Sequence, residues 1–288
     1  MNRFESILVS PKSLSAALQS NSPSQVVPVD CSWFMPGSKR DPQKEYQQRR
    51  IPHARFFDLD KVKGESAYPH MLPTRADFMK EMSRLGIKKE DHITVYDTLG
   101  IFSAPRVFWM LRYFGHQQCS ILDGGFPRWL KEQYDIDSGQ PKEFEATEYN
   151  VPHVQIDLLS TYEDVVAIVR GKKDVQIIDA RPSDRFIGAA KEPRPDISSG
   201  HIPGSISIPF STVVDPSLGE FLPSEDLKNL FTAKGIDLSK ETVLSCGSGV
   251  TASALFTALV SAGHSGSLSV YDGKVLHDNA ANFNRIVE

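Results

Sequence analysis

The stretch Thr242–His264, "TVLSCGSGVTASALFTALVSAGH", reads as a buried strand, a turn and a buried helix in direct succession. Val243 and Leu244 end an apolar run, and residues 252–259 carry apolar side chains at helical spacing with almost no charge. The six residues between them, 246–251, are predicted to form a turn whose two glycines permit tight curvature. A strand followed directly by a helix is typical of α/β folds.

Cys246 opens this turn and lies at the edge of the apolar pattern rather than within it. Backbone N–H groups of such a turn can converge on one point, and a helix N-terminus adds partial positive charge there. A thiol in this position is expected to ionise more easily than a free thiol, and the thiolate is the reactive form. We therefore favour a nucleophile over a phosphate-binding loop or an inert turn.

The chain also repeats itself. "VVPVD", which ends at Asp30, is echoed by "VQIID", which ends at Asp179, an offset of 149 (179 − 30). Four further landmarks recur at almost the same offset, and five matches of this kind indicate two homologous domains. The further pairs are Ile51-Pro52 with Ile202-Pro203, Gly86-Ile87 with Gly235-Ile236, Gly115-His116 with Gly263-His264, and Asp123-Gly124 with Asp272-Gly273.

Each copy alternates short β-branched runs with amphipathic helical stretches, which predicts an α/β fold with a mostly parallel sheet flanked by helices. We expect an N-terminal domain over residues 1–137, a polar linker over 138–157 and a C-terminal domain over 158–288. In the second copy the expected strands are 175–179, 205–210, 242–246 and 267–273, and the expected helices are 161–170 and 224–235.

The repeat identifies the reactive copy. In the first copy Asp97 stands at about the place of Cys246, and Pro105 opens the following helix. Only one copy carries the nucleophile, so we expect a catalytic C-terminal domain and a supporting N-terminal domain.

Composition narrows the class of partner. A net charge of −4 over 288 residues gives no electrostatic reason to expect nucleic acid or an anionic membrane, and no apolar stretch approaches the roughly 18 residues of a membrane span. Cys31, Cys119 and Cys246 are too far apart for a disulfide framework or a metal cluster. Cys31 and Cys119 read as small buried hydrophobes. The N-terminus lacks a signal-peptide core, so the cytoplasm is the expected compartment.

Three cysteine chemistries use a strand-to-helix turn. A phosphatase loop needs an arginine six positions after the cysteine, where Ala252 stands. A thioredoxin-type motif needs a second cysteine in the turn, where Ser248 and Gly249 stand. A sulfur carrier needs one accessible thiolate among N–H donors that can stabilise a persulfide anion, and the turn meets this demand.

At 246–252 "CGSGVTA", in the second of two tandem repeats, resembles the rhodanese superfamily, and within it most closely the 3-mercaptopyruvate sulfurtransferases. The resemblance covers most of the chain, through "SWFMPG", "FFDLD", "PHMLPT", "SAPRVFWMLRYFGH", "LDGG", "DARPSDRF", "SGHIPGS" and "VYDG". It implies that Cys246 attacks the sulfur of 3-mercaptopyruvate, keeps it as a persulfide and releases pyruvate, with no cofactor or metal. Thioredoxin, a small thiol or cyanide would then take the sulfur. The family also leaves a mitochondrial fraction open.

The resemblance further implies the site residues. Arg185 in "SDRF" and Arg194 in "KEPRPD", nine residues apart, match the family's two arginines for the donor's carboxylate and carbonyl. The loop residues Gly247, Gly249, Val250 and Thr251 would complete the substrate site. An Asp–His–Ser proton relay is implied at Asp60, His70 and Ser248.

Three alternatives stay open. Relatives that prefer thiosulfate place cations in the loop, typically as "CRKGVT", whereas "CGSGVT" has none, which favours mercaptopyruvate with slower thiosulfate transfer. A sulfur-relay protein that passes persulfide to another protein, for example toward tRNA thiolation, would use the same Cys246. An inactive binding module would have lost that cysteine.

Other residues receive plainer interpretations. His201 in "GHIPG" is predicted to be a turn histidine satisfied by backbone, and the basic cluster "QQRRIPHAR" to be a solvated face. After Gly273 the chain departs from its relatives with "KVLHDNAANFNRIVE", which predicts a shortened or remade terminal helix.

Overall fold

The computed structural model describes residues 6–20, 25–65, 70–151, 153–192 and 200–272. It divides into two compact units. Unit 1 comprises Met1–Glu65, Leu72–Gln155 and Pro216–Phe221, and unit 2 comprises Ser66–Met71, Ile156–Asp215 and Leu222–Glu288. Each half of the chain thus gives one short segment to the other unit. The two segments are equivalent in the repeat, because their first residues differ by 150 (216 − 66).

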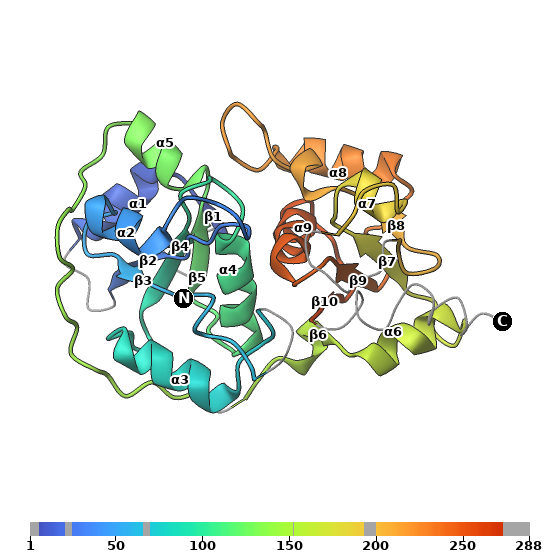
Figure 1. Cartoon of the computed structure of the whole chain (residues 1–288), viewed down its shortest axis with the longest axis horizontal. Helices are drawn as coiled ribbons and strands as arrows, with labels where there is room; N and C mark the ends of the chain where they lie inside the picture. The colour runs from blue at the N-terminus through green and yellow to red at the C-terminus, as the bar shows by residue number, and fades with distance from the viewer. Residues whose placement is uncertain (1–5, 21–24, 66–69, 152, 193–199, 273–288) are drawn as a thin grey trace. The chain divides into compact units, whose positions relative to one another are not determined.

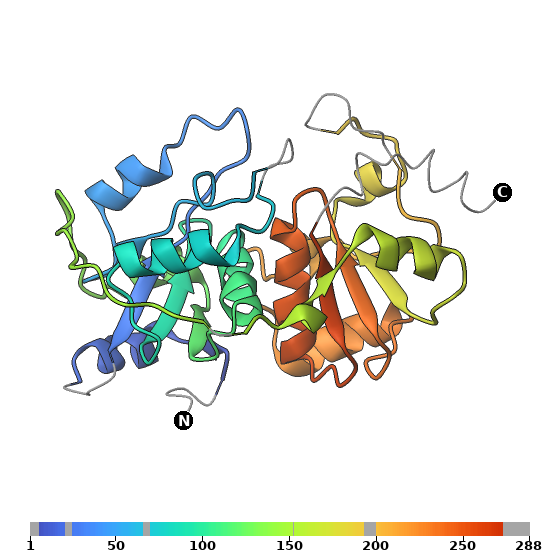
Figure 2. The ribbon, with the colours of Figure 1, turned by 90° about the horizontal axis from the view of Figure 1, so that it is seen from below.

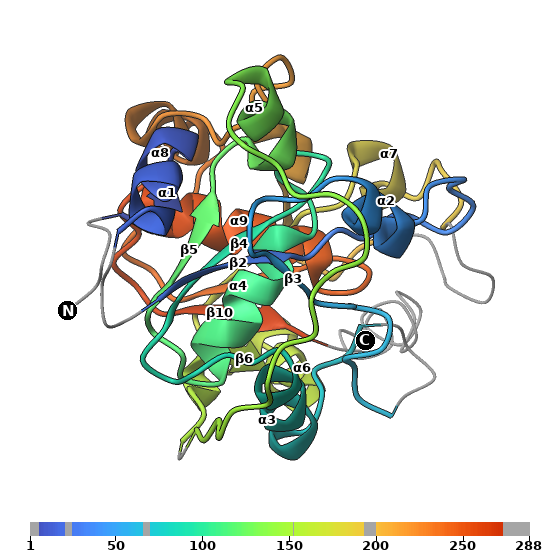
Figure 3. The same ribbon diagram turned by 90° about the vertical axis from the view of Figure 1, so that its left-hand side faces the viewer.

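Unit 1 contains five parallel strands in the order β1-β5-β4-β2-β3 (Figure 1). Buried side chains of three helices, among them Leu14, Tyr46 and Trp129, pack on one face. The helices α3 and α4 lie on the opposite face (Figure 3). There the ring of Phe78 stacks on the ring of Phe114, with the ring centroids 4.2 Å apart. The elements are β1 (Leu8–Val9), α1 (Pro11–Leu18), β2 (Val26–Asp30), α2 (Pro42–Gln48), β3 (Arg55–Phe56), α3 (Arg75–Arg84), β4 (His92–Tyr96), α4 (Ala104–Tyr113), β5 (Cys119–Leu122) and α5 (Gly125–Lys131).

Unit 2 repeats this plan with the strand order β6-β10-β9-β7-β8, all parallel and visible side by side in Figure 2. Val165 of α6 packs with Ile177 and Val243 on one face of the sheet. The elements are a 3₁₀ turn (Ile156–Leu158), β6 (Leu159–Ser160), α6 (Tyr162–Val169), β7 (Gln176–Asp179), α7 (Ser183–Phe186), β8 (Ile206–Ser207), a second 3₁₀ turn (Phe210–Thr212), α8 (Ser224–Ala233), β9 (Thr242–Ser245), α9 (Val250–Ser261) and β10 (Leu268–Tyr271).

The predicted fold class is confirmed: two α/β sheets of parallel strands, each flanked by helices. The expected helices 161–170 and 224–235 are α6 and α8, and the expected strands are β7 to β10. The strand expected over 205–210 is shorter, because only Ile206–Ser207 pairs with β7. The segment after Gly273, for which a remade helix was predicted, lies outside the described residues.

The turn before α9 is shorter than the sequence predicts. The helix begins at Val250, so the turn has four residues, 246–249, and not six. The reason is Gly249, which caps the helix with a φ of 75°, a left-handed conformation that glycine adopts without a steric penalty. The predicted burial of this helix is confirmed, because Val250, Leu255 and Leu259 are at most 2% exposed.

Candidate active site

Cys246 follows the last residue of β9, at the carboxyl edge of the sheet of unit 2. The register of β7 with β9 places Asp179 opposite Ser245, and the next N–H, that of Ala180, donates to the Ser245 carbonyl at 2.8 Å. Both strands therefore end together, and the segments that follow them start from one edge. Ligands of open parallel sheets bind at this edge. Cys246 is 5% exposed there.

The start of α9 lies directly after the cysteine. Gly247 and Ser248 are half-buried in the turn, Val250 is buried, and Thr251 is half-buried in the first helical turn. The Ser253 hydroxyl donates to the Gly249 carbonyl at 2.7 Å and holds the turn against the helix. The first turn of α9 carries no acidic side chain of its own, so no carboxylate of this turn offsets its positive end. This is a favourable place for an anion.

Arg185 lies on α7, the short helix that follows β7. Its Nη2 group donates to Glu192 Oε2, and its side chain is 18% exposed. The Nε group of Arg185 is buried and meets no acceptor among the residues that the structure describes. Arg185 therefore retains donor capacity beside its ion pair. Arg194, its predicted companion, lies outside the described residues.

Two buried residues that the sequence reading missed surround this arginine. Arg181 donates through Nε to both oxygens of Asp179, at 3.0 and 3.1 Å, and through Nη2 to Oδ2 at 2.5 Å. Its Nη1 group donates to Glu192 Oε1 at 2.9 Å. Arg181 and Glu192 are 1% and 0% exposed in their side chains. The signal was an arginine directly after a strand, which has to find acidic partners when it is buried.

The three predicted relay residues divide between the units. His70 is buried, has a φ of 60° and belongs to the short segment Ser66–Met71 that is grouped with unit 2, as is Ser248. Asp60 is exposed and belongs to unit 1, where its Oδ1 accepts the Trp33 indole N–H at 3.2 Å. The tertiary structure thus groups His70 with the unit that carries Cys246.

In unit 1 the position of the cysteine is occupied by Asp97, whose carboxylate fills the turn between β4 and α4. Oδ1 accepts the Leu99 N–H, and Oδ2 accepts the N–H groups of Phe102, Ser103 and Ala104, all at 2.9 Å. Asp97 is 1% exposed. The backbone of this turn and helix start is therefore an anion cradle, and a side chain of the protein occupies it.

The structural roles predicted for His201, Cys31 and Cys119 are confirmed, whereas the role predicted for the basic cluster is partly wrong. His201 donates from Nδ1 to the Phe186 carbonyl at 2.8 Å, so the predicted backbone-satisfied histidine is confirmed. Cys31 and Cys119 are fully buried, as predicted, and burial raises the pKa of Cys119 to about 12. The solvated face predicted for "QQRRIPHAR" is wrong at two of its arginines, because Arg50 and Arg55 are buried and donate to backbone carbonyls of distant segments.

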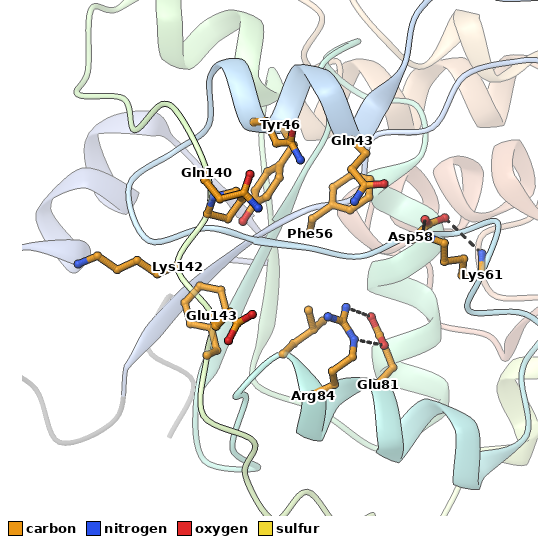
Figure 4. A pocket seen from close by; sticks show the side chains of 14 residues that line it. Gln43, Tyr46, Phe56, Asp58, Lys61, Glu81, Arg84, Gln140, Lys142 and Glu143 are labelled. Atoms are coloured by element: carbon orange, nitrogen blue, oxygen red, sulfur yellow. Dashed lines mark hydrogen bonds and ion pairs between the residues drawn. The ribbon is translucent and has the colours of Figure 1, made fainter.

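A cavity of about 610 Å³ lies in unit 1, between α2, α3 and residues 140–144 (Figure 4). Arg84 pairs with Glu81 and Lys61 with Asp58, so these lining charges neutralise one another. None of the described residues that line the cavity is a cysteine, serine or histidine, and we do not assign the cavity to the reaction. The lining residues are Gln43, Tyr46, Gln47, Phe56, Asp58, Lys61, Glu81, Arg84, Leu85, Gln140, Pro141, Lys142, Glu143 and Phe144.

Across the described ranges, no group of three or more histidine, cysteine, aspartate or glutamate side chains is arranged to hold a metal ion. None of the helices in those ranges has the length and apolar character that crossing a membrane requires.

Comparison with known proteins agrees with this geometry. The family profile described as a rhodanese-like domain matches residues 10–132 and 161–275. The 3-mercaptopyruvate sulfurtransferase of Mus musculus is 40% identical over 276 residues, which cover 92% of this chain and 89% of that protein. The thiosulfate sulfurtransferase of Mus musculus is also 40% identical, over 278 residues with the same coverage.

A solved structure, that of the Tum1 protein from Saccharomyces cerevisiae, superimposes with a TM-score of 0.87 at 33% identity and covers 93% of both chains. The two family matches fall on the two parallel sheets, and the relatives that share them are named as sulfurtransferases. The chain therefore belongs to the rhodanese family, as a sulfurtransferase built from two tandem rhodanese-like domains.

Proposed function

We propose that the chain transfers sulfur from 3-mercaptopyruvate, through a persulfide on Cys246, to a thiol acceptor. The Cys246 thiolate attacks the donor's sulfur, the carbon–sulfur bond breaks, and its electron pair forms the enolate of pyruvate, which takes up a proton. The acceptor thiolate then attacks the outer sulfur and regenerates the Cys246 thiolate. Cyanide in place of the thiol gives thiocyanate.

The observation that carries this proposal is that one cysteine and one arginine follow neighbouring strands at the same edge of the sheet. Cys246 follows β9, Arg185 lies on the helix after β7, and the two strands are neighbours in register. The N-terminus of α9 favours the persulfide anion. The partly exposed guanidinium of Arg185 suits a carboxylate, because a guanidinium group can donate two parallel hydrogen bonds to the two carboxylate oxygens.

The turn residues argue for mercaptopyruvate as the donor. Residues 246–253 carry no cation, so the donor's charge has to be met by Arg185 and, as we propose, by Arg194. Gly247, Gly249, Val250 and Thr251 would supply the N–H groups around the sulfur. Thiosulfate is the second candidate donor, since a thiosulfate sulfurtransferase resembles the chain as closely as a mercaptopyruvate enzyme does.

We keep the Asp60–His70–Ser248 relay as part of the proposal. The enolate needs a proton and the incoming thiol has to lose one, so a histidine between a carboxylate and a hydroxyl would serve both steps. The grouping of His70 with unit 2 supports it. We further propose that residues 158–288 carry the chemistry, that residues 1–137 support it, and that residues 138–157 link the two.

The acceptor and the compartment are also proposals. Thioredoxin or a small thiol would accept the outer sulfur of a single persulfide, whereas transfer to a protein for tRNA thiolation would use the same cysteine. A relative from Arabidopsis thaliana is named as mitochondrial, and a structural neighbour is described as a sulfur transferase subunit of yeast mitochondrial complex I. We expect a cytoplasmic protein with a mitochondrial fraction.

The deciding experiment measures turnover on 3-mercaptopyruvate and on thiosulfate. Mass spectrometry of the protein's cysteine-containing peptides then shows which cysteine carries added sulfur. We expect faster pyruvate release than thiosulfate turnover, and an adduct of about 32 Da, one sulfur atom, on Cys246. Cys31 and Cys119 are internal controls, because both are 0% exposed and belong to unit 1. A preference for thiosulfate would move the assignment to the second donor. The absence of an adduct with either donor would contradict the persulfide.

A further inference from the structure

Four charged side chains of unit 2 form one continuous line of ion pairs. Asp179 holds Arg181, Arg181 holds Glu192, and Glu192 holds Arg185. The two central members are almost fully buried. Buried charges are costly unless each one is paired and hydrogen-bonded, so a line of this kind is retained only where every member has its partner.

Glu192 divides its two oxygens between two arginines. Oε1 accepts from Arg181 Nη1 at 2.9 Å, and Oε2 accepts from Arg185 Nη2. Arg181 is itself fixed by Asp179 and by the Gly200 carbonyl, at 2.6 Å from Nη2. Arg181 therefore fixes the Glu192 carboxylate through Oε1. The other oxygen, Oε2, then determines the direction of the Arg185 guanidinium.

The fork of Arg185 is only partly used. Nη2 is taken by Glu192, whereas Nε is buried and meets no acceptor among the described residues. A planar guanidinium fixed at one corner presents its remaining N–H groups in a set direction. A carboxylate next to a carbonyl, as in an α-keto acid, gains from such a fixed direction.

The charge of the line matters as much as its geometry. Two carboxylates and two guanidinium groups sum to zero, so Glu192 cancels the charge that Arg185 would otherwise add to the site. The turn after Cys246 adds no cation. Among the described residues, the line and the turn together add no net positive charge, so a dianion such as thiosulfate is attracted by them less than it would be by an unpaired Arg185.

We propose that Glu192 is a positioning residue that selects monoanionic α-keto acid donors over dianionic donors, by orienting Arg185 and cancelling its excess charge. This inference rests on the proposed function, in which Arg185 binds the donor's carboxylate. Glu192 acts through Arg185 and does not itself touch the donor.

The test is the Glu192→Gln variant, which keeps the shape of the side chain and removes its charge. We expect kcat/KM for 3-mercaptopyruvate to fall about tenfold, mainly through KM, because one arginine now faces an amide N–H group. For thiosulfate kcat/KM should stay level or rise. The thiosulfate KM should also become more sensitive to salt, because the site has gained one positive charge.

Glu192→Asp separates orientation from charge. It keeps the charge but shortens the reach to Arg185, so mercaptopyruvate turnover should fall while thiosulfate turnover and its salt dependence stay as in the wild type. The matched control is Glu220→Gln in unit 1, which removes a partner of Arg128 at 3.1 Å and should change neither donor.

The outcomes distinguish failure of the proposed sulfur transfer from failure of the proposed role of Glu192. Wild-type protein that releases no pyruvate and forms no adduct overturns the proposed function itself. Wild-type protein that is active on mercaptopyruvate, with Glu192→Gln lowering both donors by one factor or changing neither, overturns the role of Glu192 alone. The Glu192→Asp comparison decides the matter even where the glutamine variant unfolds at a lower temperature.

Discussion

Asp97 of unit 1 and Cys246 of unit 2 occupy the same position of the repeat, 149 residues apart (246 − 97), and their turns use one backbone device in two ways. In unit 1 the Asp97 carboxylate accepts four N–H groups and closes the anion site with the protein's own side chain. In unit 2 the position holds a small thiol ahead of a helix whose first turn has no acidic side chain. The comparison teaches that one copy of the turn binds the protein's own carboxylate, whereas the other presents a thiol at the start of a helix.

The ends of the neighbouring strands, β2 in unit 1 and β7 in unit 2, also differ. Asp179 meets Arg181, whereas the equivalent residue Asp30 meets Ser32, whose N–H donates to Oδ1 at 2.9 Å. The other oxygen of Asp30 is buried and finds no hydrogen-bond donor in the described part of the chain. Burial, with a contribution from nearby Asp97, raises the pKa of Asp30 to about 7. Asp30 therefore stands where its counterpart has an arginine partner, and its buried carboxyl keeps its proton up to about pH 7.

The largest effect is expected from Cys246→Ser. We expect sulfur transfer to fall to background, by roughly a thousandfold or more, because the hydroxyl cannot form the persulfide. The melting temperature should stay close to that of the wild type. Cys119→Ala, in which a buried cysteine of unit 1 is removed, should keep its activity. Residual transfer in the serine variant would show that unit 2 is not the reactive copy.

Asp179→Asn should cause the largest loss of stability. It leaves Arg181, which is 1% exposed, with a charge that has lost its main partner, and breaking a buried pair in this way costs about 3–5 kcal/mol. Urea unfolding measures the change. Asp174→Asn is the control, since Asp174 pairs with Lys240 at an exposed site and should leave the urea midpoint unchanged. Equal midpoints for both variants would contradict an essential Asp179–Arg181 pair.

Asp97→Ala should destabilise unit 1 by about 2–4 kcal/mol, because four N–H groups lose their acceptor at once. Acetate should restore part of the melting temperature, since a free carboxylate can enter the emptied cradle. Chloride at the same ionic strength is the control for general salt effects. An equal response of the variant and the wild type to acetate would argue against a cradle that accepts a free anion.

Asp30→Asn should change the pH dependence of stability. A carboxyl whose pKa rises from 3.8 unfolded to about 7 folded binds its proton more tightly in the folded state. Its stabilising effect is therefore full below about pH 4 and is lost as the pH rises through 7, by roughly 4 kcal/mol. Asp123, with a pKa raised by burial to about 6, adds a smaller effect of the same sign.

The asparagine variant should flatten this slope and be more stable than the wild type at pH 8. Unfolding in urea at pH 5, 6, 7 and 8 measures it. Parallel pH curves for the variant and the wild type would mean that Asp30 does not carry the dependence.

Local pattern was enough for the architecture and for singling out Cys246 as the proposed nucleophile. The offset of 149 residues between Asp30 and Asp179 already indicated two copies. Apolar residues at strand or helix spacing located the expected strands and helices of the second copy within a few residues. Cys246 stood out because its neighbours along the chain, glycines and a helix start, define its surroundings. Such features are local, so the order of residues determines them.

Pairing and burial between distant segments needed the tertiary structure. Glu192 meets Arg181 and Arg185 only when the segment after α7 folds back on β7, and Arg50 is buried because the chain returns to it at Gly139. The exchange of Ser66–Met71 and Pro216–Phe221 between the units has no local signal either. These features arise from contacts between residues far apart in the chain, where a charge is stabilised only by the partner that the fold brings to it.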